Sequence, residues 1–401
     1  MITSGRKVLA VIPLPYSETG RFWERDMGLL VSGLRDHGID ARLVAFGQPH
    51  TPDPKRPLIL GSLGDIENPA WWKDQTPWGA VLNTWSAPRY DRIRQAALAA
   101  TPRVLEKLDT DGVRAPWIWP GYYWRATLGG YWDSPVKTKR LFAPLLTLLR
   151  MGTTTILPAL LDKKMARTMG QLPVVAAESP IATARMQRFL RRFGQKKTQV
   201  VTIPHPSAAA PAIPMNETKR GNTVISVGRW HTYQKNFPLL LSVLERFLTL
   251  RPGWNAEIVG ELPKSKHSTE SRVPETLRGR IRFHGLIPHH EISPVYQRSK
   301  IFLMTSRFES YNIAAAEALC CGCSVVGPSD IASVPFFVSS ASGTSACRPS
   351  APHLLDALCA EADAWKLDQR NPNTISQKWL AAVGIQAVSK LVIDTLEDIG
   401  P

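Results

Sequence analysis

The sequence predicts an α/β protein of two domains, each built on a doubly wound parallel sheet. Three observations support this fold class. Short apolar or β-branched runs alternate with helix-like stretches, the pattern of repeated strand–helix units. Residues 205–221 are rich in Pro, Ala and polar side chains without periodicity, as in an interdomain linker. A chain of 401 residues also exceeds the usual size of a single core.

Before the linker, residues 1–204 carry strand and helix signals in turn. KVLAVIPL at 7–14 is typical of a buried strand, and a loop with Gly20 follows it. Apolar side chains then repeat with a helical period from Phe22 to Leu34. Further candidate strands are ARLVAF, PLILGS, AVLNTW, APWIWP and PVVAAES. The first apolar run ends in prolines and does not resemble a secretory signal.

After the linker, residues 222–375 predict the second domain. Its candidate strands are TVISVGR, AEIVGE, RIRFHGL, IFLMTSR and SVVGPS. Residues 376–401 are amphipathic, and we expect this C-terminal helix to cross back to the first domain. Two such sheets place ligands in a cleft at the carboxyl ends of their strands.

The net charge of +16 requires a partner or a structural reason. Basic residues flank an apolar run at 141–161, which Pro144, Gly152 and Pro158 interrupt too often for a spanning helix. One interpretation is peripheral attachment to an anionic membrane surface; the other is core helices with a solvated basic side. No nucleic-acid-binding motif is present, so we expect no nucleic-acid partner.

All five cysteines lie late in the chain, three of them in CCGC at 320–323. An odd, clustered set indicates reduced thiols in a cytoplasmic protein. CCGC lacks a second ligand pair at finger-like spacing, so we expect no metal site.

Two cations stand where the second domain's first strand ends. Arg229 closes TVISVGR, and Lys235 follows six residues later at the start of a helix. Two positive charges at the mouth of an α/β cleft suit a diphosphate and stabilise charge on it as it leaves. Alone, this pair would more often be a solvated loop.

Two acids bracket a second candidate element, FESYNIAAAEALCCG at 308–322. If Asn312 caps the helix, its free N–H groups form an anion site. Glu317 lies in a helix too apolar to face water, and Glu309 precedes its start. A sugar nucleotide would satisfy both, because its hydroxyls donate to carboxylates. The alternative is a structural Glu317 with a buried partner, and a solvated Glu309.

The second domain resembles the retaining glycosyltransferases of family four (group one), which have the GT-B fold. Four elements carry the resemblance: VGR…QKN, AEIVGE, IRFHGL and SRFESYNIAAAEALCCGCSVV. The match covers about residues 220–330, and the first domain only by layout. The resemblance implies two Rossmann-like domains facing each other across a cleft.

The resemblance also implies roles for individual residues. Arg229 and Lys235 would hold the donor diphosphate, and Glu309 would bind hydroxyls of the transferred sugar. Glu317 would accept from the ribose. The further donor-binding positions it implies are Gly20, Leu286, Ile287, Ser310, Tyr311, Asn312 and Ile313. The reaction would be transfer with retention from a UDP- or GDP-hexose type of donor, without metal or cofactor.

The acceptor side is less defined. Nine of the 13 tryptophans lie within the first 132 residues, which suits a carbohydrate or lipid-linked acceptor, as in polysaccharide or glycolipid biosynthesis. The family's first-domain histidine is replaced near Tyr122 or Tyr123. Ser310 and Asn312 stand where the family has glycines. The alternatives are therefore an inactive nucleotide-sugar-binding protein and a nucleotide-sugar epimerase of the same fold.

Overall fold

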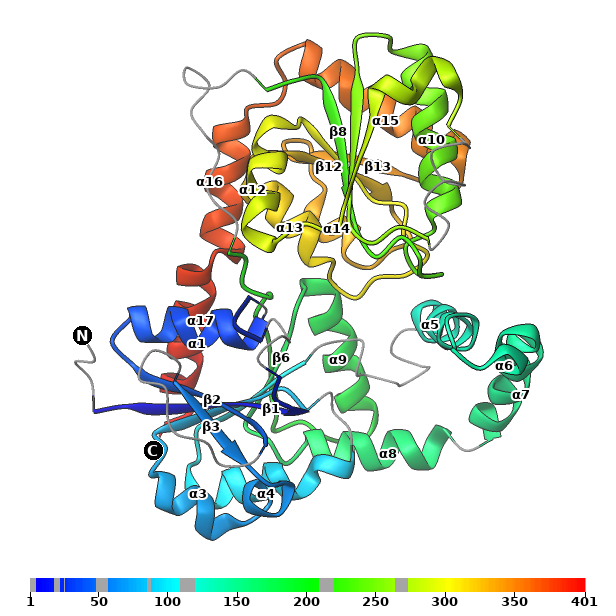
Figure 1. Cartoon of the computed structure of the whole chain (residues 1–401). Coiled ribbons are helices and arrows are strands. Elements are labelled where there is room, and N and C mark those ends of the chain that lie inside the picture. The colour runs from blue at the N-terminus through cyan, green and yellow to red at the C-terminus, as the bar shows by residue number, and fades with distance from the viewer. Residues whose placement is uncertain are drawn as a thin grey trace. The chain divides into compact units, whose positions relative to one another are not determined.

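A computed structural model of the chain divides into two units. The first comprises Met1–Ile118, Thr154–Ala208 and Ala382–Pro401, and the second comprises Trp119–Thr153 and Ala209–Ala381 (Figure 1). The described residues are 5–17, 22–24, 26–47, 57–84, 88–108, 120–156, 158–208, 220–263 and 273–400. Only the backbone is described at 88, 120–123, 151–156 and 158–161.

The first unit contains a seven-stranded sheet in which every adjacent pair is parallel, in the order β3-β2-β1-β4-β5-β6-β7. The strands are β1 (Lys7–Pro15), β2 (Asp40–Phe46), β3 (Leu58–Gly61), β4 (Gly79–Leu82), β5 (Val104–Lys107), β6 (Val174–Ala177) and β7 (Gln199–Thr202). The helices are η1 (Phe22–Glu24), α1 (Asp26–Asp36), α2 (Leu63–Ile66), α3 (Pro69–Gln75), η2 (Pro88–Tyr90), α4 (Asp91–Ala100), α8 (Pro158–Met169), α9 (Pro180–Arg192) and α17 (Ile385–Asp398).

Helices cover both faces of this sheet. α1 and α17 lie on one face and α3 and α4 on the other (Figure 1). Val8, Leu30 and Val392 belong to one buried cluster that joins β1, α1 and α17. The C-terminal segment therefore completes the core of the first unit, because its apolar side chains cover the sheet beside α1.

The second unit contains a six-stranded parallel sheet in the order β10-β9-β8-β11-β12-β13. Its strands are β8 (Thr223–Val227), β9 (Asn255–Val259), β10 (Ile281–Gly285), β11 (Ile301–Leu303), β12 (Ser324–Pro328) and β13 (Gly343–Ala346). Its helices are α5 (Pro120–Trp132), α6 (Lys137–Leu141), α7 (Ala143–Ile156), α10 (Phe237–Leu250), η3 (Glu275–Arg280), α12 (His289–Arg298), α13 (Ile313–Cys320), α14 (Val334–Phe337), α15 (Ala351–Lys366) and α16 (Pro372–Val383).

The residues of CCGC lie in the core of this unit. Cys320, Cys321 and Cys323 are buried, and the Cys323 thiol donates to the carbonyl of Tyr296 at 3.1 Å. Among the described residues, no group of three His, Cys, Asp or Glu side chains could hold a metal ion. These small side chains instead fill space between α13 and β12.

The unit boundaries differ from the expected ones in two places. Residues 119–153, expected within a continuous first domain at 1–204, group with the second unit. The C-terminal segment expected at 376–401 as one helix forms α16 and α17, which meet at Gly384. Gly384 is extended, and the preceding Val383 carbonyl accepts from the amide of Ser207, so the helix is interrupted there. The middle of the expected linker lies outside the described residues.

Two strand expectations in the first unit also need comment. β5 was not expected, because two of its four residues are the charged Glu106 and Lys107, both fully buried. The strand expected at APWIWP falls almost entirely outside the described residues, and Pro120 begins α5. Within the described part of the chain, no helix is long and apolar enough to cross a membrane.

Candidate functional site

The two predicted cations lie in the loop between β8 and α10. Arg229 is exposed, and among the described residues its guanidinium has no partner. Lys235 is mostly buried, and its Nζ donates to Glu309 Oε1 at 2.5 Å. An ammonium has three donors, and Glu309 is the single partner of Lys235 within the described ranges. Two N–H bonds therefore remain for a ligand.

Glu309 is buried rather than solvated, which excludes the alternative of an exposed loop carboxylate. Its Oε1 accepts from Ser306 Oγ at 2.6 Å as well as from Lys235. Its Oε2 accepts from Gln234 Nε2 at 3.2 Å. A carboxylate has about four acceptor positions, so one on Oε2 remains for a hydroxyl. The ion pair places a charged acceptor beside a charged donor in a poorly solvated place.

The two loops that carry this pair are tied together by their backbones. The Arg307 amide donates to the Gln234 carbonyl at 2.8 Å, and Thr305 Oγ1 donates to the Lys235 carbonyl at 3.1 Å. β8 and β11 are neighbours in the sheet, so their carboxyl ends bring both loops to one edge. The sheet topology thus joins residues 74 positions apart.

Asn312 caps α13, as the sequence predicted. Its side chain accepts from the amide of Ala315 at 3.2 Å, and its backbone is left-handed, with φ of 71°. Asparagine tolerates this region better than most residues, which explains how it replaces a glycine here. Ile313, the first helical residue, is partly exposed, whereas the ring of Tyr311 is buried against Phe337. The helix N-terminus is therefore accessible at Ile313 and closed at Tyr311.

Glu317 lies one turn further along α13 and has protein partners. His289 Nε2 lies 2.7 Å from Oε1, and the Tyr296 hydroxyl donates to Oε2 at 3.3 Å. Burial raises the pKa of Tyr296 well above its usual range, and the Glu317 charge raises it further, so the hydroxyl stays a donor. Each oxygen accepts one bond from these two, which leaves each with a second acceptor position. No sequence signal pointed to His289, which starts a separate helix.

The loop after β10 holds the two remaining positions expected in the second unit. Leu286 is 69% exposed, and Ile287 is half-buried. Gly285 has a φ of +67°, and its carbonyl accepts from the Gly260 amide at 2.7 Å. A Cβ on Gly260 would lie 1.9 Å from the Gly228 carbonyl oxygen, so a glycine is required there. The loops after β8, β9 and β10 thus pack backbone against backbone.

The expected positions outside the second sheet are less well placed. Gly20 lies outside the described residues. Tyr122 and Tyr123 lie on α5, where only the backbone is described. His231 pairs with Glu261 at 3.4 Å, and His284 pairs with Glu257 at 2.9 Å.

A buried charge network in the first unit was missed from the sequence. Lys107 Nζ lies 3.0 Å from Asp26 Oδ1 and 3.0 Å from His205 Nδ1, while His205 lies 2.7 Å from Asp26 Oδ2. Burial alone would raise the pKa of Asp26, but the charges of His205 and Lys107 lower it well below its usual range. No local pattern reveals this cluster, because its members come from α1, β5 and the segment after β7.

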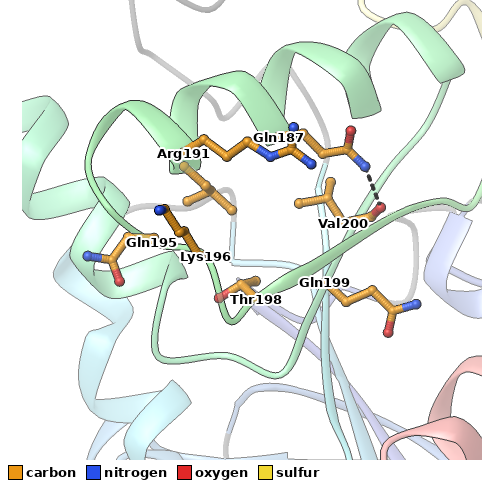
Figure 2. Close-up of a pocket in the computed structure, with 8 residues that line it drawn as sticks. Gln187, Arg191, Gln195, Lys196, Thr198, Gln199 and Val200 are labelled. Carbon is orange, nitrogen blue, oxygen red and sulfur yellow. Dashed lines mark hydrogen bonds between the residues drawn. The ribbon is translucent and has the colours of Figure 1, made fainter.

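A cavity of about 620 Å³ lies in the first unit between α9 and β7. Figure 2 shows Arg191 and Lys196 beside it, and Gln187 Nε2 donating to the Val200 carbonyl at 3.2 Å. None of its lining residues is a predicted site residue. We therefore place the candidate site at the second sheet, on the geometry of its charged groups.

Solved structures identify the fold. Over 98% of its length the chain superposes on sucrose-phosphate synthase from Thermosynechococcus elongatus, with a TM-score of 0.62 at 12% identity and 99% of that chain covered. Anabaena Alr3699/HepE in complex with UDP-glucose gives a TM-score of 0.59 at 12% identity, over 98% of this chain and 99% of that one. The chain has the GT-B fold of two parallel-sheet α/β domains, as the sequence predicted.

Sequence comparison identifies the class. Residues 221–359 match the family model described as glycosyl transferases group 1. The gpi3 subunit of phosphatidylinositol N-acetylglucosaminyltransferase from Schizosaccharomyces pombe is 28% identical over 145 residues, 36% of this chain and 31% of that protein. One Homo sapiens subunit of the enzyme with the same name is 34% identical over 104 residues, 26% of this chain and 21% of that protein.

These findings confirm the resemblance inferred from SRFESYNIAAAEALCCGCSVV: the second unit carries a group 1 glycosyltransferase domain, and the protein is of the glycosyltransferase class. The matched part spans about a fifth to a third of the length of the curated relatives.

Proposed function

We propose that the protein is a retaining, metal-independent glycosyltransferase that uses a nucleotide-sugar donor of the UDP- or GDP-hexose type. Its acceptor is a glycan or a lipid-linked glycan. The observation that carries the proposal is the Lys235–Glu309 ion pair in the loops that also hold the exposed Arg229, at the edge where parallel α/β sheets bind ligands.

The two cations supply what the leaving group needs. When the bond between the sugar's anomeric carbon and the phosphate oxygen breaks, the electron pair stays on the diphosphate. Arg229 and the two free N–H bonds of Lys235 stabilise that charge, the part that a metal ion plays in other transferases. Removing one such donor costs roughly 10²–10³ in kcat.

The two carboxylates hold the hydroxyls at either end of the donor. The open acceptor position on Glu309 takes a hydroxyl of the transferred sugar, and the open positions on Glu317 take the ribose. The acceptor oxygen then attacks the same face that the diphosphate leaves, and its proton passes to the departing phosphate. No protein nucleophile is required, and the anomeric configuration is retained.

The names of the curated relatives make UDP-N-acetylglucosamine the first donor to test, because three of them are N-acetylglucosaminyltransferase subunits. A phosphatidylinositol-type acceptor follows from the same names and agrees with the lipid-linked class.

The test is calorimetric titration of UDP, GDP and ADP into the wild type and Glu317→Gln. We expect one nucleotide to saturate the wild type, and the variant to weaken it by at least tenfold, about 1.4 kcal/mol. Glu275→Gln is the matched control, because that carboxylate lies in the same unit and is 90% exposed. Its affinity should equal that of the wild type.

Product formation then separates an enzyme from a binding protein. Release of UDP from UDP-N-acetylglucosamine, or from UDP-glucose, in the presence of acceptor supports transfer. Saturable binding without product from any donor indicates the inactive binding protein. If no nucleotide binds at millimolar concentration, the donor-site proposal is wrong.

A further inference from the structure

The segment between α5 and α8 is basic and has no acidic residue. From Ser134 to Leu161 the sequence contains Lys137, Lys139, Arg140 and Arg150 and neither Asp nor Glu. The first three are exposed on α6. A solvated surface helix normally mixes both signs of charge, so this segment is complementary to an anionic partner.

The helix α7 has its apolar side chains on the wrong face for a solvated protein. Ala143 and Thr147 are buried, and the Thr147 hydroxyl donates to the Ala143 carbonyl at 2.8 Å. The leucines at positions 145, 148 and 149 instead face solvent, between 52% and 62% exposed. The small and polar side of this helix is therefore covered, and its leucine side is not.

Exposed apolar side chains concentrate in this one region. Seven of the 14 exposed large hydrophobic residues in the described part of the chain fall between 132 and 149: Trp132, Val136, Leu141, Phe142, Leu145, Leu148 and Leu149. A contiguous apolar patch of this kind marks an interaction site. We call these seven residues together with Lys137, Lys139 and Arg140 the basic–apolar face.

A hollow in this face has the chemistry of a lipid contact. A cavity of about 510 Å³ is lined by Trp132, Lys137, Thr138, Arg140 and Leu141. An indole and a leucine beside two cations match the boundary between acyl chains and phosphate headgroups.

The same segment contacts both donor-site loops. Asp133 follows α5 and accepts from the amide of Tyr233, at 3.0 Å to Oδ1, inside the loop that runs from Arg229 to Lys235. The rings of Trp132 and Tyr233 lie 5.9 Å apart. Movement of the basic–apolar face would therefore reach the cation loop directly.

A second set of contacts reaches the loop before Glu309. Arg125 on α5 donates to the Arg307 carbonyl at 2.8 Å and pairs with Asp330 at 2.9 Å. A Cβ on Gly129 would lie 3.2 Å from the Tyr233 ring and 3.3 Å from the Phe308 ring, which shows how closely α5 lies against both loops.

We propose that the basic–apolar face docks on an anionic phospholipid bilayer, and that α5 couples this docking to the loops that hold Lys235 and Glu309. The docking is independent of the nucleotide-sugar proposal, whereas the consequence of the coupling for donor binding rests on it. The bilayer, rather than an acidic protein, is favoured because leucine, phenylalanine and tryptophan alternate here with lysine and arginine.

The docking is tested by flotation with vesicles of phosphatidylcholine alone and with 30% phosphatidylglycerol. The wild type should float with the anionic vesicles and stay behind with the neutral ones, and added salt should release it. Leu145→Glu combined with Leu148→Glu should abolish flotation. Leu250→Glu combined with Leu367→Glu is the matched control, with equally exposed leucines of the same unit, and should float.

Charge is tested separately by replacing Lys137, Lys139 and Arg140 with glutamine. Each basic residue near an anionic surface is worth roughly fivefold in partitioning, so the triple variant should bind about 100-fold more weakly. Failure of the wild type to float overturns the docking, as does equal flotation of the leucine variant. A dimer in solution that the leucine variant converts to monomer, without vesicle binding, would show that a second copy covers this face.

The coupling is tested by hydrogen–deuterium exchange of residues 229–238 with and without anionic vesicles, which needs no nucleotide. In the wild type, docking should slow exchange of this peptide by at least threefold. Asp133→Asn weakens the bond to the Tyr233 amide and should float normally but lose most of the slowing. Unchanged exchange in the wild type, or equal slowing in the variant, overturns the coupling and leaves the docking standing.

Discussion

Two lysines at the ends of parallel strands have opposite surroundings. Lys107, at the end of β5 in the first unit, is fully buried between Asp26 and His205. Lys235, in the loop after β8 in the second unit, pairs with Glu309, and the same loop holds the exposed Arg229. Both lie where α/β sheets bind ligands, yet only the second has positive charge to spare.

This difference shows how a charged group is recognised as structural or functional. The first cluster satisfies its own charges away from solvent, so its removal should affect folding. The second cluster leaves donors and acceptor positions open, so its removal should affect ligands. Variants of the two clusters can therefore break or sharpen the distinction.

The largest expected effect is on the stability of the first unit. Lys107→Met leaves the buried Asp26 with a single charged partner, and we expect a loss of about 3–5 kcal/mol of unfolding free energy. Urea denaturation of the variant measures it. Lys300→Met, which removes an exposed hydrogen bond to Asn222, is the control and should change stability by less than about 1 kcal/mol.

The pH dependence of the same variant is a further check. Because the folded pKa of Asp26 is lowered, its contribution is complete above about pH 4 and is lost as the pH falls through the folded value. The wild type should therefore lose stability more steeply than Lys107→Met below pH 4. Equal slopes would contradict the structural role of the cluster.

Turnover should respond to the second lysine. We expect Lys235→Met to lower kcat by roughly 10²–10³, because one donor to the leaving phosphate is lost. Steady-state release of UDP from the preferred donor measures the change. Lys300→Met should keep the wild-type rate, and an equal rate in Lys235→Met would place the chemistry elsewhere.

The cap of α13 should have an intermediate effect. Asn312→Ala loses the bond to the Ala315 amide and forces a left-handed alanine, which together cost about 2 kcal/mol. Asn312→Gly loses only the cap and should cost less than half as much. Thermal unfolding of both variants gives the order, and a glycine variant less stable than the alanine variant would refute it.

The smallest effect concerns Asp162 on α8. Burial raises the pKa of Asp162 to about 6, although the charge of Arg192 opposes the rise. The native state thus takes up a proton between about pH 4 and 6 that the unfolded state lacks, so stability falls as the pH rises through this range. Asp162→Asn should remove this slope and gain about 1 kcal/mol at pH 7, measured by urea denaturation at both pH values.

The sequence predicted what depends on short-range pattern. The strand before Arg229 and the cap at Asn312 follow from local propensity and spacing, and the structure contains both. Prediction failed where tertiary contacts decide. β5 was missed because buried charges interrupt its apolar pattern, and no local signal pairs His289 with Glu317 across 28 residues.

The same reason explains the error at 119–153. Its assignment to the second unit depends on Arg125 and Asp133, which contact loops more than 90 residues away. The apolar run at 141–161 left two interpretations open, because spacing does not reveal which face of a helix is covered. The exposure of its leucines in the structure favours the membrane interpretation.

Of the two lysines, we propose that Lys235 meets the nucleotide and Lys107 does not. Calorimetric titration of UDP into the wild type, Lys235→Met and Lys107→Met at low temperature tests this most directly. We expect Lys235→Met to weaken UDP binding by at least tenfold, and folded Lys107→Met to bind as the wild type does. Unchanged affinity in Lys235→Met, with a loss confined to Lys107→Met, would contradict the assignment.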